Sequence, residues 1–170
     1  SLKTGVYSNA DLAFIKKAIK IFSYIIYSFS NQKTLKNLLT VDVETKLLNG
    51  KSFLKLASTD LMKAKSVNAP STLALIKIDK FIDDESLFES NPFPKVLKSI
   101  TDAIKEATTN NNVVGRISRD VFGIYFFNSD SKDVRLWAER LRLKIARTPI
   151  VVSSKQTTYT VSVGIAAAHE

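Results

Sequence analysis

Apolar residues recur along this chain at two kinds of spacing, and each kind predicts one type of element. From residue 11 to residue 29 they return at heptad-like intervals, which predicts a long amphipathic helix near the start of the chain. The same helical spacing predicts further helices over about 52–65, 94–109 and 132–146. The first of these three ends at Asn68–Pro70, because proline disfavours a helical conformation in the residue before it.

Shorter apolar runs have the length of strands. The run at 72–78 is nearly continuous, which is typical of a central strand that is covered on both faces. Further strands are predicted at 113–117, 121–127, 150–152 and 157–167. The resulting order, β-α-β-β-α-β, is that of the split, ferredoxin-like arrangement. We therefore expect an α+β domain with a central mixed, largely antiparallel sheet flanked by helices.

The length of the chain and its helical start predict two parts. With 170 residues and 45% apolar side chains, the chain can bury one sizeable core. We expect an N-terminal helical connector over residues 1–40 and the α+β domain over residues 41–170. The apolar stripe of the connector either packs on its own domain, or pairs with a second copy or an upstream sensor. The sequence leaves these alternatives open, and a homodimer through this helix is one expected assembly.

Composition narrows the classes of function. No run of about 20 uncharged apolar residues occurs, so no membrane span is expected. The absence of cysteine excludes disulfides, thiolate metal sites and cysteine nucleophiles, and it agrees with a cytoplasmic location. The formal charge of +9 favours anionic partners, but the basic residues are scattered and no aromatic residues are interleaved among them. We therefore expect no nucleic-acid partner.

Four segments resemble, in order, the motifs of the GGDEF (diguanylate cyclase) family. They are Asp42–Asn49 (DVETKLLN), Thr72–Phe81 (TLALIKIDKF), Arg116–Phe122 (RISRDVF) and Thr160–Ala166 (TVSVGIA). The segments are similar to the D-x-L-T-G-L-x-N-R, D-[IL]-D-x-F, R-x-GGDEF and T-x-S-[IV]-G-[IV]-A motifs of that family. The resemblance implies the palm fold of nucleotidyl cyclases, and the family's final helix would fall beyond Glu170.

The resemblance also implies a chemistry and the residues for it. Members of the family join two GTP molecules into cyclic di-GMP across a symmetric dimer, and carboxylates hold the metal ions for this reaction. Lys77 stands at the position of the first metal-binding Asp, and Val121 replaces the second carboxylate of the central motif, whereas Asp120 keeps an acidic metal-ligand position. At about 4 Å and an effective dielectric near 20, each lost attraction or new repulsion is worth roughly 4 kcal/mol. We therefore expect metal binding to be severely weakened.

The positions that would hold the nucleotide also differ from the family pattern. Two glycines whose bare backbone lets GTP approach are replaced, the second by Arg119, whose side chain should obstruct that approach. Glu85 stands where the family has a guanine-binding Asn and can still accept hydrogen bonds, whereas Pro94 replaces a guanine-binding Asp and has no side-chain acceptor. No inhibitory site is expected, because the R-x-x-D positions of the family are Thr109 and Asn112 here.

The surviving side chains have roles that we weigh as alternatives. Asp79 is expected to brace the loop after its strand, and Arg116 to support the hairpin. Lys77 is expected to form an ion pair with Asp120 in place of the metal, or to hold a phosphate together with Arg119 without metal. Lys77, Asp79 and Asp120 thus form a vestigial site in which Asp120 is the candidate metal ligand, and no residue is predicted to be catalytic.

These departures predict a domain of cyclic di-GMP signalling that does not catalyse the family's reaction. We expect a regulatory or scaffold module that passes a conformational signal to other signalling domains or proteins and needs no cofactor. Two alternatives stay open. One is a weak diguanylate cyclase that uses Asp79 and Asp120 on magnesium, and the other is a GTP-binding module without turnover.

Overall fold

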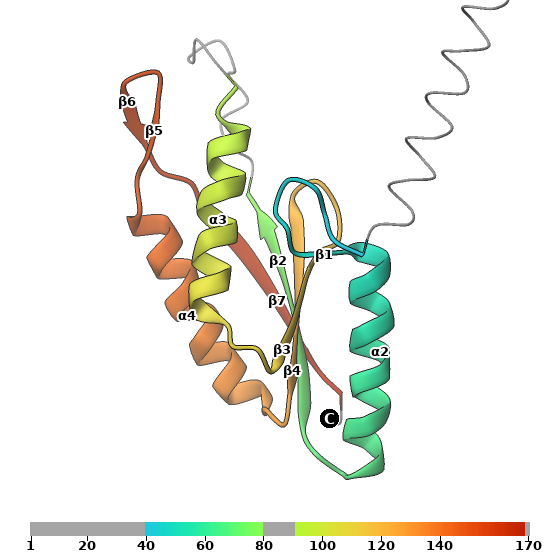
Figure 1. Cartoon of the computed structure of the whole chain (residues 1–170). Helices are drawn as coiled ribbons and strands as arrows, with labels where there is room; N and C mark the ends of the chain where they lie inside the picture. The colour runs from blue at the N-terminus through green and yellow to red at the C-terminus, as the bar shows by residue number, and fades with distance from the viewer. Residues whose placement is uncertain (1–39, 80–90, 169–170) are drawn as a thin grey trace, which may run out of the picture. The chain divides into compact units, whose positions relative to one another are not determined.

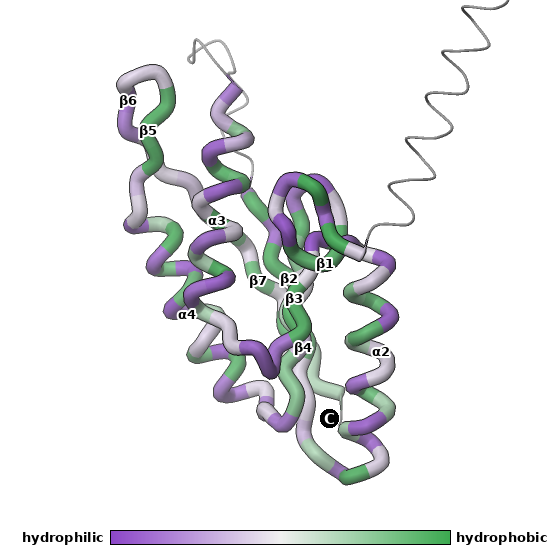
Figure 2. The backbone as a smooth tube through the Cα atoms, viewed as in Figure 1, coloured by the Kyte–Doolittle hydropathy of each residue, from purple (hydrophilic) through white to green (hydrophobic). Residues whose placement is uncertain are grey.

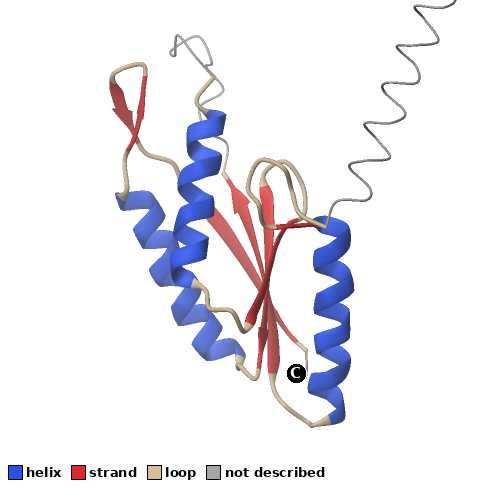
Figure 3. Cartoon of the chain, in the orientation of Figure 1, coloured by secondary structure: helices blue, strands red, loops and turns tan. Residues whose placement is uncertain are grey.

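Figures 1 and 3 show a computed structural model of the chain, which describes residues 40–79 and 91–168. The strands are β1 (Leu48–Asn49), β2 (Ser71–Ile78), β3 (Asn112–Arg116), β4 (Val121–Phe127), β5 (Ile150–Val152), β6 (Lys155–Thr157) and β7 (Val161–Ala167). The helices are α2 (Gly50–Ser66), α3 (Phe93–Ala107) and α4 (Ser131–Arg147). The helix predicted over residues 11–29 lies outside the described residues.

Five strands form one sheet in the order β1-β3-β4-β2-β7, and β5 and β6 form a separate hairpin. Strand β2 runs antiparallel to both of its neighbours, β4 and β7, and β1 alone pairs in parallel, with β3. Helix α2 lies on one face of the sheet, and α3 and α4 lie on the other (Figure 1). None of the described helices has the length and apolarity that a membrane span requires. The predicted α+β fold with a largely antiparallel sheet is confirmed.

The main core lies between the sheet and the helices α3 and α4. Alternate side chains of β2 and β4 enter it, as the two-residue period of strands requires. The buried core residues include Ala74, Ile76, Ile78, Phe122, Ile124 and Phe126 from these strands, and Val96, Ile100, Ile104, Val134, Leu141 and Ile145 from the helices. Figure 2 shows the consequence, since the central strands are largely hydrophobic whereas the helices alternate between hydrophobic and hydrophilic residues.

Side-chain caps fix where α2 and α4 begin. The Asn49 side-chain oxygen accepts a hydrogen bond from the Ser52 backbone N–H at 2.9 Å, and the Asp130 carboxylate accepts one from the Asp133 N–H at 2.9 Å. Each cap satisfies a backbone donor that has no partner within its helix. Because Asn49 also pairs with Arg116 in the β1–β3 ladder, the start of α2 is held next to the turn that follows β3.

Two glycines let α2 pack closely on the sheet. Gly115 of β3 and Gly123 of β4 are cross-strand partners, and the Phe53 side chain of α2 lies against both. A Cβ atom at Gly115 would lie 2.5 Å from Phe53, and one at Gly123 would lie 2.6 Å from it. Phe53 is only 2% exposed. The two glycines and Phe53 thus form a slot, called the glycine slot below, which holds α2 over the strands that flank the central turn.

The rest of this sheet face is open among the described residues. Leu75 of β2 is the cross-strand partner of both Gly123 and Gly164, so it points to the face of the glycine slot. Leu75 is 43% exposed, and a Cβ atom at Gly164 would meet no other atom within 4 Å. Helix α2 therefore covers β3 and β4 but leaves β2 and the edge strand β7 uncovered on this face.

The structure differs from the predicted elements in two places. The last strand, predicted to run unbroken over 157–167, is divided, because β6 ends at Thr157 and β7 begins at Val161. Strands β5 and β6 form a hairpin in which Ser153 and Ser154 have positive φ angles of 47° and 67°, the backbone pattern of tight hairpin turns. Strand β1 was not among the predicted strands, since two residues are too few to give a periodic signal.

Candidate functional site

The turn after β3 and the end of β2 lie side by side. The Ile78 backbone N–H donates a hydrogen bond to the Asp120 carbonyl oxygen at 2.9 Å. In the sheet, Lys77 is paired with Val121 of β4 on one side and with Ser162 of β7 on the other. The sheet thus brings together the first-strand and central motifs, and the candidate site is assembled where β2 ends between β4 and β7.

Lys77 and Val121 are direct neighbours in the β2–β4 ladder. The Cα atoms of directly opposed residues in antiparallel strands lie about 5 Å apart. The two positions at which the resemblance implies carboxylates therefore face each other, one with an exposed ammonium group and the other with an apolar side chain. Of the three carboxylates that the resemblance implies at these positions, only that of Asp120 is present in the sequence.

Asp79 connects the end of β2 to the start of β7. Its carboxylate accepts hydrogen bonds from the Thr160 and Ser162 hydroxyls, each at 2.6 Å, and its backbone N–H donates to the Thr160 carbonyl oxygen at 3.0 Å. The hydrogen bonds from Ser162 and Thr160 lower the pKa of Asp79, partial burial opposes them, and the charge of Lys77 lowers it further. Asp79 thus joins the ends of β2 and β7, whereas the loop after β2 that it was expected to brace lies outside the described residues.

Sequence reasoning missed Thr160 and Ser162 as the partners of Asp79. The signal that could have found them is their spacing, because residues two apart in an extended segment point to the same face. Both hydroxyls therefore reach the carboxylate that ends the neighbouring strand.

Asp120 interacts with its own turn, and its expected ion pair with Lys77 is wrong. The Asp120 carboxylate accepts a hydrogen bond from the Ser118 hydroxyl at 3.3 Å. Within residues 40–79 and 91–168, neither Lys77 nor Asp120 has an ion-pair partner within 4.0 Å. The expectation failed because the strand register places Val121, and not Asp120, opposite Lys77.

Arg119 lies against the start of α3. Its guanidinium carbon is 4.8 Å from the centroid of the Phe93 ring, which is a cation–π distance. Phe93 begins α3, and Pro94, at the expected guanine-binding position, follows it in the first turn. Arg119 therefore bridges the turn and the helix start, which are the two places where the resemblance puts the nucleotide. Phe93 is a partner that the sequence did not reveal.

On the other side of the turn, Arg116 is buried in a polar network. Its side chain is 6% exposed. Nε and Nη2 donate to the Arg119 carbonyl oxygen at 3.2 and 2.8 Å, and Nη1 donates to the carboxylates of Asp42 at 3.0 Å and Glu44 at 2.5 Å. Burial opposes the charge of Arg116, but Glu44 and Asp42 outweigh it and raise the pKa of the guanidinium. The expected supporting role of Arg116 is confirmed.

Asp42 shapes the opening segment (Thr40–Asn49) and ties it to the turn. Its Oδ1 atom accepts hydrogen bonds from the Thr45 backbone N–H at 2.9 Å and the Thr45 hydroxyl at 2.8 Å, in addition to that from Arg116. Burial raises the pKa of Asp42, but the hydrogen bonds from Thr45 and Arg116 outweigh it, so the pKa is lowered. The segment that matches the first family motif therefore acts here as a structural clamp.

The other predicted positions have structural roles or lie outside the described residues. Glu85 belongs to the residues that the structure does not describe. The Thr109 backbone N–H and hydroxyl donate to the Asn112 side-chain oxygen at 2.9 and 3.2 Å. These contacts close the turn that leads into β3.

The described residues do not fit the metal chemistry that the resemblance implies. Within 40–79 and 91–168, no three histidine, cysteine, aspartate or glutamate side chains gather so that they could hold an ion. Magnesium needs several oxygen ligands, but both carboxylate oxygens of Asp79 accept hydroxyl hydrogen bonds and Lys77 adds a positive charge beside them. Among the residues that the structure describes, Asp120, the candidate metal ligand, has no neighbouring carboxylates that would complete a site.

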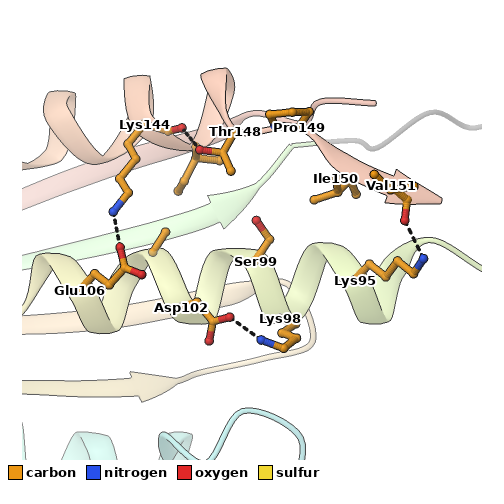
Figure 4. A pocket seen from close by; sticks show the side chains of 12 residues that line it. Lys95, Lys98, Ser99, Asp102, Glu106, Lys144, Thr148, Pro149, Ile150 and Val151 are labelled. Carbon is orange, nitrogen blue, oxygen red and sulfur yellow. Dashed lines mark hydrogen bonds and ion pairs between the residues drawn. The ribbon is translucent and has the colours of Figure 1, made fainter. Parts of the chain in front are cut away.

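A separate groove of about 470 Å³ lies between α3, the end of α4 and β5 (Figure 4). Lys98 binds Asp102 of the same helix at 2.6 Å, and Lys144 of α4 binds Glu106 of α3. Lys95 donates to the Val151 carbonyl oxygen at 2.6 Å. Because each lysine that lines the groove is already bound to a carboxylate or a carbonyl oxygen, the groove does not resemble a site for a nucleotide triphosphate. The turn and the end of β2 are therefore the stronger candidate site.

Comparison with known proteins gives one family and many related structures. The family described as "Diguanylate cyclase, GGDEF domain" matches residues 39–170. Diguanylate cyclase DosC of Escherichia coli K12 is 23% identical over 127 residues, which cover 74% of this chain and 28% of that protein. The chain thus spans less than a third of the length of the curated relatives that it matches.

Among solved structures, the chain resembles GGDEF domains. The FimX GGDEF domain of Pseudomonas aeruginosa is 20% identical, with a TM-score of 0.69 over 76% of this chain and 80% of that one. The GGDEF domain of DgcB of Caulobacter crescentus, solved in complex with c-di-GMP, is 20% identical, with a TM-score of 0.71 over 75% and 74%. Diguanylate cyclase SiaD of P. aeruginosa, in complex with its activator SiaC, is 19% identical, with a TM-score of 0.69 over 93% and 61%. At these identities the likeness establishes the fold.

Proposed function

Because the chain belongs to the GGDEF (diguanylate cyclase) family, we propose that it is a regulatory or scaffold module of cyclic di-GMP signalling that does not make cyclic di-GMP itself. The observation that carries the proposal is the pairing of Lys77 with Val121 across the β2–β4 ladder. A cationic and an apolar side chain face each other where the family's reaction needs carboxylates. A domain that does not catalyse this reaction can still signal through contacts with other domains or proteins.

Electrostatics supports this proposal. Two unit charges about 4 Å apart interact by roughly 4 kcal/mol at an effective dielectric near 20. A cation at the end of β2 would lose the attraction of the absent carboxylates and would meet the repulsion of Lys77. Asp79 accepts hydrogen bonds from the Thr160 and Ser162 hydroxyls and does not replace the lost ligands. We therefore expect the turn to bind magnesium poorly, and no cofactor is part of the proposed function.

The position of Arg119 supports the proposal independently. Its guanidinium lies on the Phe93 ring at the start of α3, next to the position where the family binds guanine. A nucleotide that approached the backbone of the turn would have to displace this side chain from the ring. The contact between Arg119 and Phe93 thus disfavours the nucleotide pose on which the family's reaction depends.

The partners of such a module would be other signalling domains or proteins. SiaD has been solved with an activator protein, SiaC, so a domain of this fold can belong to a protein that is regulated by a partner. We propose that residues 1–40 form a helical connector to a further domain or to a second copy, and that residues 41–170 form the signalling domain. We place the module in the cytoplasm, where its relatives' nucleotide chemistry would operate.

A second candidate function is GTP binding without turnover. The observation that favours it is the exposed ammonium group of Lys77, which has no ion-pair partner among the described residues and is free to meet a phosphate. Glu85 and Arg119 would be the other contacts of the nucleotide. In this alternative GTP raises the melting temperature of the chain but no product forms.

The experiment that tests the proposal is a calorimetric titration of GTP into the 170-residue chain, with and without magnesium, followed by an assay of the same mixture for cyclic di-GMP. We expect no magnesium-dependent heat and no product. Product above a blank without protein, abolished by Asp120→Asn, would contradict the proposal. GTP binding without product would favour the second candidate function.

A pair of double variants sharpens this test. Lys77→Asp with Val121→Glu restores the two missing carboxylates, and we expect it to gain magnesium-dependent binding of GTP. Lys77→Asn with Val121→Gln has nearly the same shapes but adds no carboxylate, and we expect no gain. If the two double variants behave alike, the loss of the carboxylates is not the reason for inactivity.

A further inference from the structure

The outward stripe of α4 has a composition that the proposed function does not use. Successive residues of a helix are turned by about 100°, and the buried residues of α4 lie on one side of it. The opposite side, within a sector of about 80°, presents a stripe of alternating basic and leucine residues. This outer stripe consists of Lys132, Leu136, Arg140, Leu143 and Arg147. It extends about 22 Å along the helix.

The cations of the outer stripe are not neutralised by the protein. Lys132, Arg140 and Arg147 are exposed, and within residues 40–79 and 91–168 none of them has an ion-pair partner. The ion pairs of α4 lie on its flanks instead, between Arg142 and Glu139 and between Lys144 and a glutamate of α3. The outer stripe therefore presents net positive charge.

The two leucines of the outer stripe are exposed in the same place. Leu136 is 60% exposed and Leu143 is 37% exposed. They are seven residues apart, so they lie almost in line along the helix with Arg140 between them. A partner of this surface must accept both apolar side chains and cations.

We propose that the outer stripe of α4 is a peripheral binding surface for anionic phospholipid bilayers. The interface of such a bilayer offers phosphate groups for the cations and acyl chains for the leucines, side by side. Nucleic acid would take up the cations but not the leucines, and no aromatic residue lies in the stripe to stack on bases. The net charge of +9 adds a long-range attraction to an anionic surface. This activity is independent of whether the turn binds a nucleotide.

The test is co-sedimentation of the full chain with vesicles of phosphatidylglycerol and phosphatidylcholine, compared with vesicles of phosphatidylcholine alone. We expect binding to the anionic vesicles only, weakening as salt is added. The double variant Arg140→Gln with Arg147→Gln is expected to bind about thirtyfold more weakly, because each basic side chain near an anionic surface raises the binding constant about fivefold. Leu136→Ser is expected to weaken binding as well, without changing the charge.

The matched control is Lys51→Gln with Lys55→Gln on α2, which removes the same net charge from exposed positions on the opposite face of the sheet (Figure 1). We expect this control to keep most of the binding. Equal loss in the two double variants, or no sedimentation with anionic vesicles at low salt, would overturn the proposal. So would binding to duplex DNA that the α4 variants weaken while their vesicle binding is unchanged.

Discussion

The two sides of the turn Ser118–Asp120 differ in how their charges are satisfied. On one side, here called the clamp side, Arg116 is buried and donates hydrogen bonds to two carboxylates and to the turn itself. On the other, here called the open side, Lys77 is exposed and lies opposite Val121. The clamp side contacts the turn at the Arg119 carbonyl oxygen and the open side at the Asp120 carbonyl oxygen, but only the clamp side contains paired charges.

The difference teaches that the shape of the hairpin and the chemistry of the family are separable. A buried charge is costly unless it is paired, so the clamp side depends on every member of its network. Exposed charges cost little in water, so the open side tolerates a lysine where the family has a carboxylate. The conformation of the turn therefore rests on the clamp side and does not require an ion at the open side. Stability measurements can test this contrast directly.

The largest effect is expected on the clamp side, for Arg116→Met. This change removes the hydrogen bonds of the guanidinium to Asp42, Glu44 and the Arg119 carbonyl oxygen without leaving a cavity. We expect the free energy of unfolding to fall by about 3 kcal/mol, measured by urea denaturation. Arg142→Met, which removes an exposed ion pair with Glu139, is the control and should change little. Equal losses in both variants would mean that the network is not a clamp.

A somewhat smaller effect on stability is expected at the glycine slot, where α2 packs on the strands that flank the same turn. The added methyl group of Gly123→Ala would lie 2.6 Å from the Phe53 ring, so the helix must shift. We expect a loss of about 2 kcal/mol. Gly164→Ala places the same methyl group on the same face, where it meets no atom within 4 Å, and should be neutral or slightly stabilising. Similar melting temperatures for the two variants would argue against the slot.

Asp79, on the open side, is expected to have an effect of about 1 kcal/mol at neutral pH, because its two hydrogen bonds are exposed. Its pKa is lowered in the folded state, so its contribution is complete above the unfolded value of about 3.8 and is lost as the pH falls through the lower folded value. Asp79→Asn should therefore show a shallower loss of stability below pH 3.8. An unchanged slope would show that Asp79 does not brace the strands.

The smallest effect is expected for Lys77→Met. The side chain is exposed and has no ion-pair partner among the described residues, so we expect the free energy of unfolding to change by no more than about 0.5 kcal/mol. The measurement is the same urea denaturation. A loss as large as that of Arg116→Met would remove the contrast between the two sides and would show that Lys77 has a structural role.

Most of the fold could be predicted from the sequence because its signals are local. The apolar run of β2 and the helical spacing of α4 place these elements within a residue or two of their observed bounds. Strand β1 could not be predicted, because two residues carry no period and its strand character comes from pairing with β3. The break between β6 and β7 escaped prediction because the residues at 158–160 are compatible with a strand.

The candidate site was predictable in its residues but not in its contacts. The motif spacing identified Lys77, Asp120 and Val121. Whether Asp120 or Val121 lies opposite Lys77 depends on the strand register. The contact between Arg116 and Asp42 joins residues 74 positions apart, and no periodicity in the chain encodes such a distance. Long-range pairing of this kind is fixed by the tertiary fold.

The free edge of β7 affects how the protein behaves at high concentration. Its sequence, VSVGIAA, contains no charged residue and no proline, and within the described residues it has a neighbouring strand on one side only. Natural edge strands are commonly guarded by lysine, proline or a bulge, because their free backbone groups can pair with another chain. Among the described strands, β7 is therefore the one through which we expect the domain to pair with a second chain at high concentration.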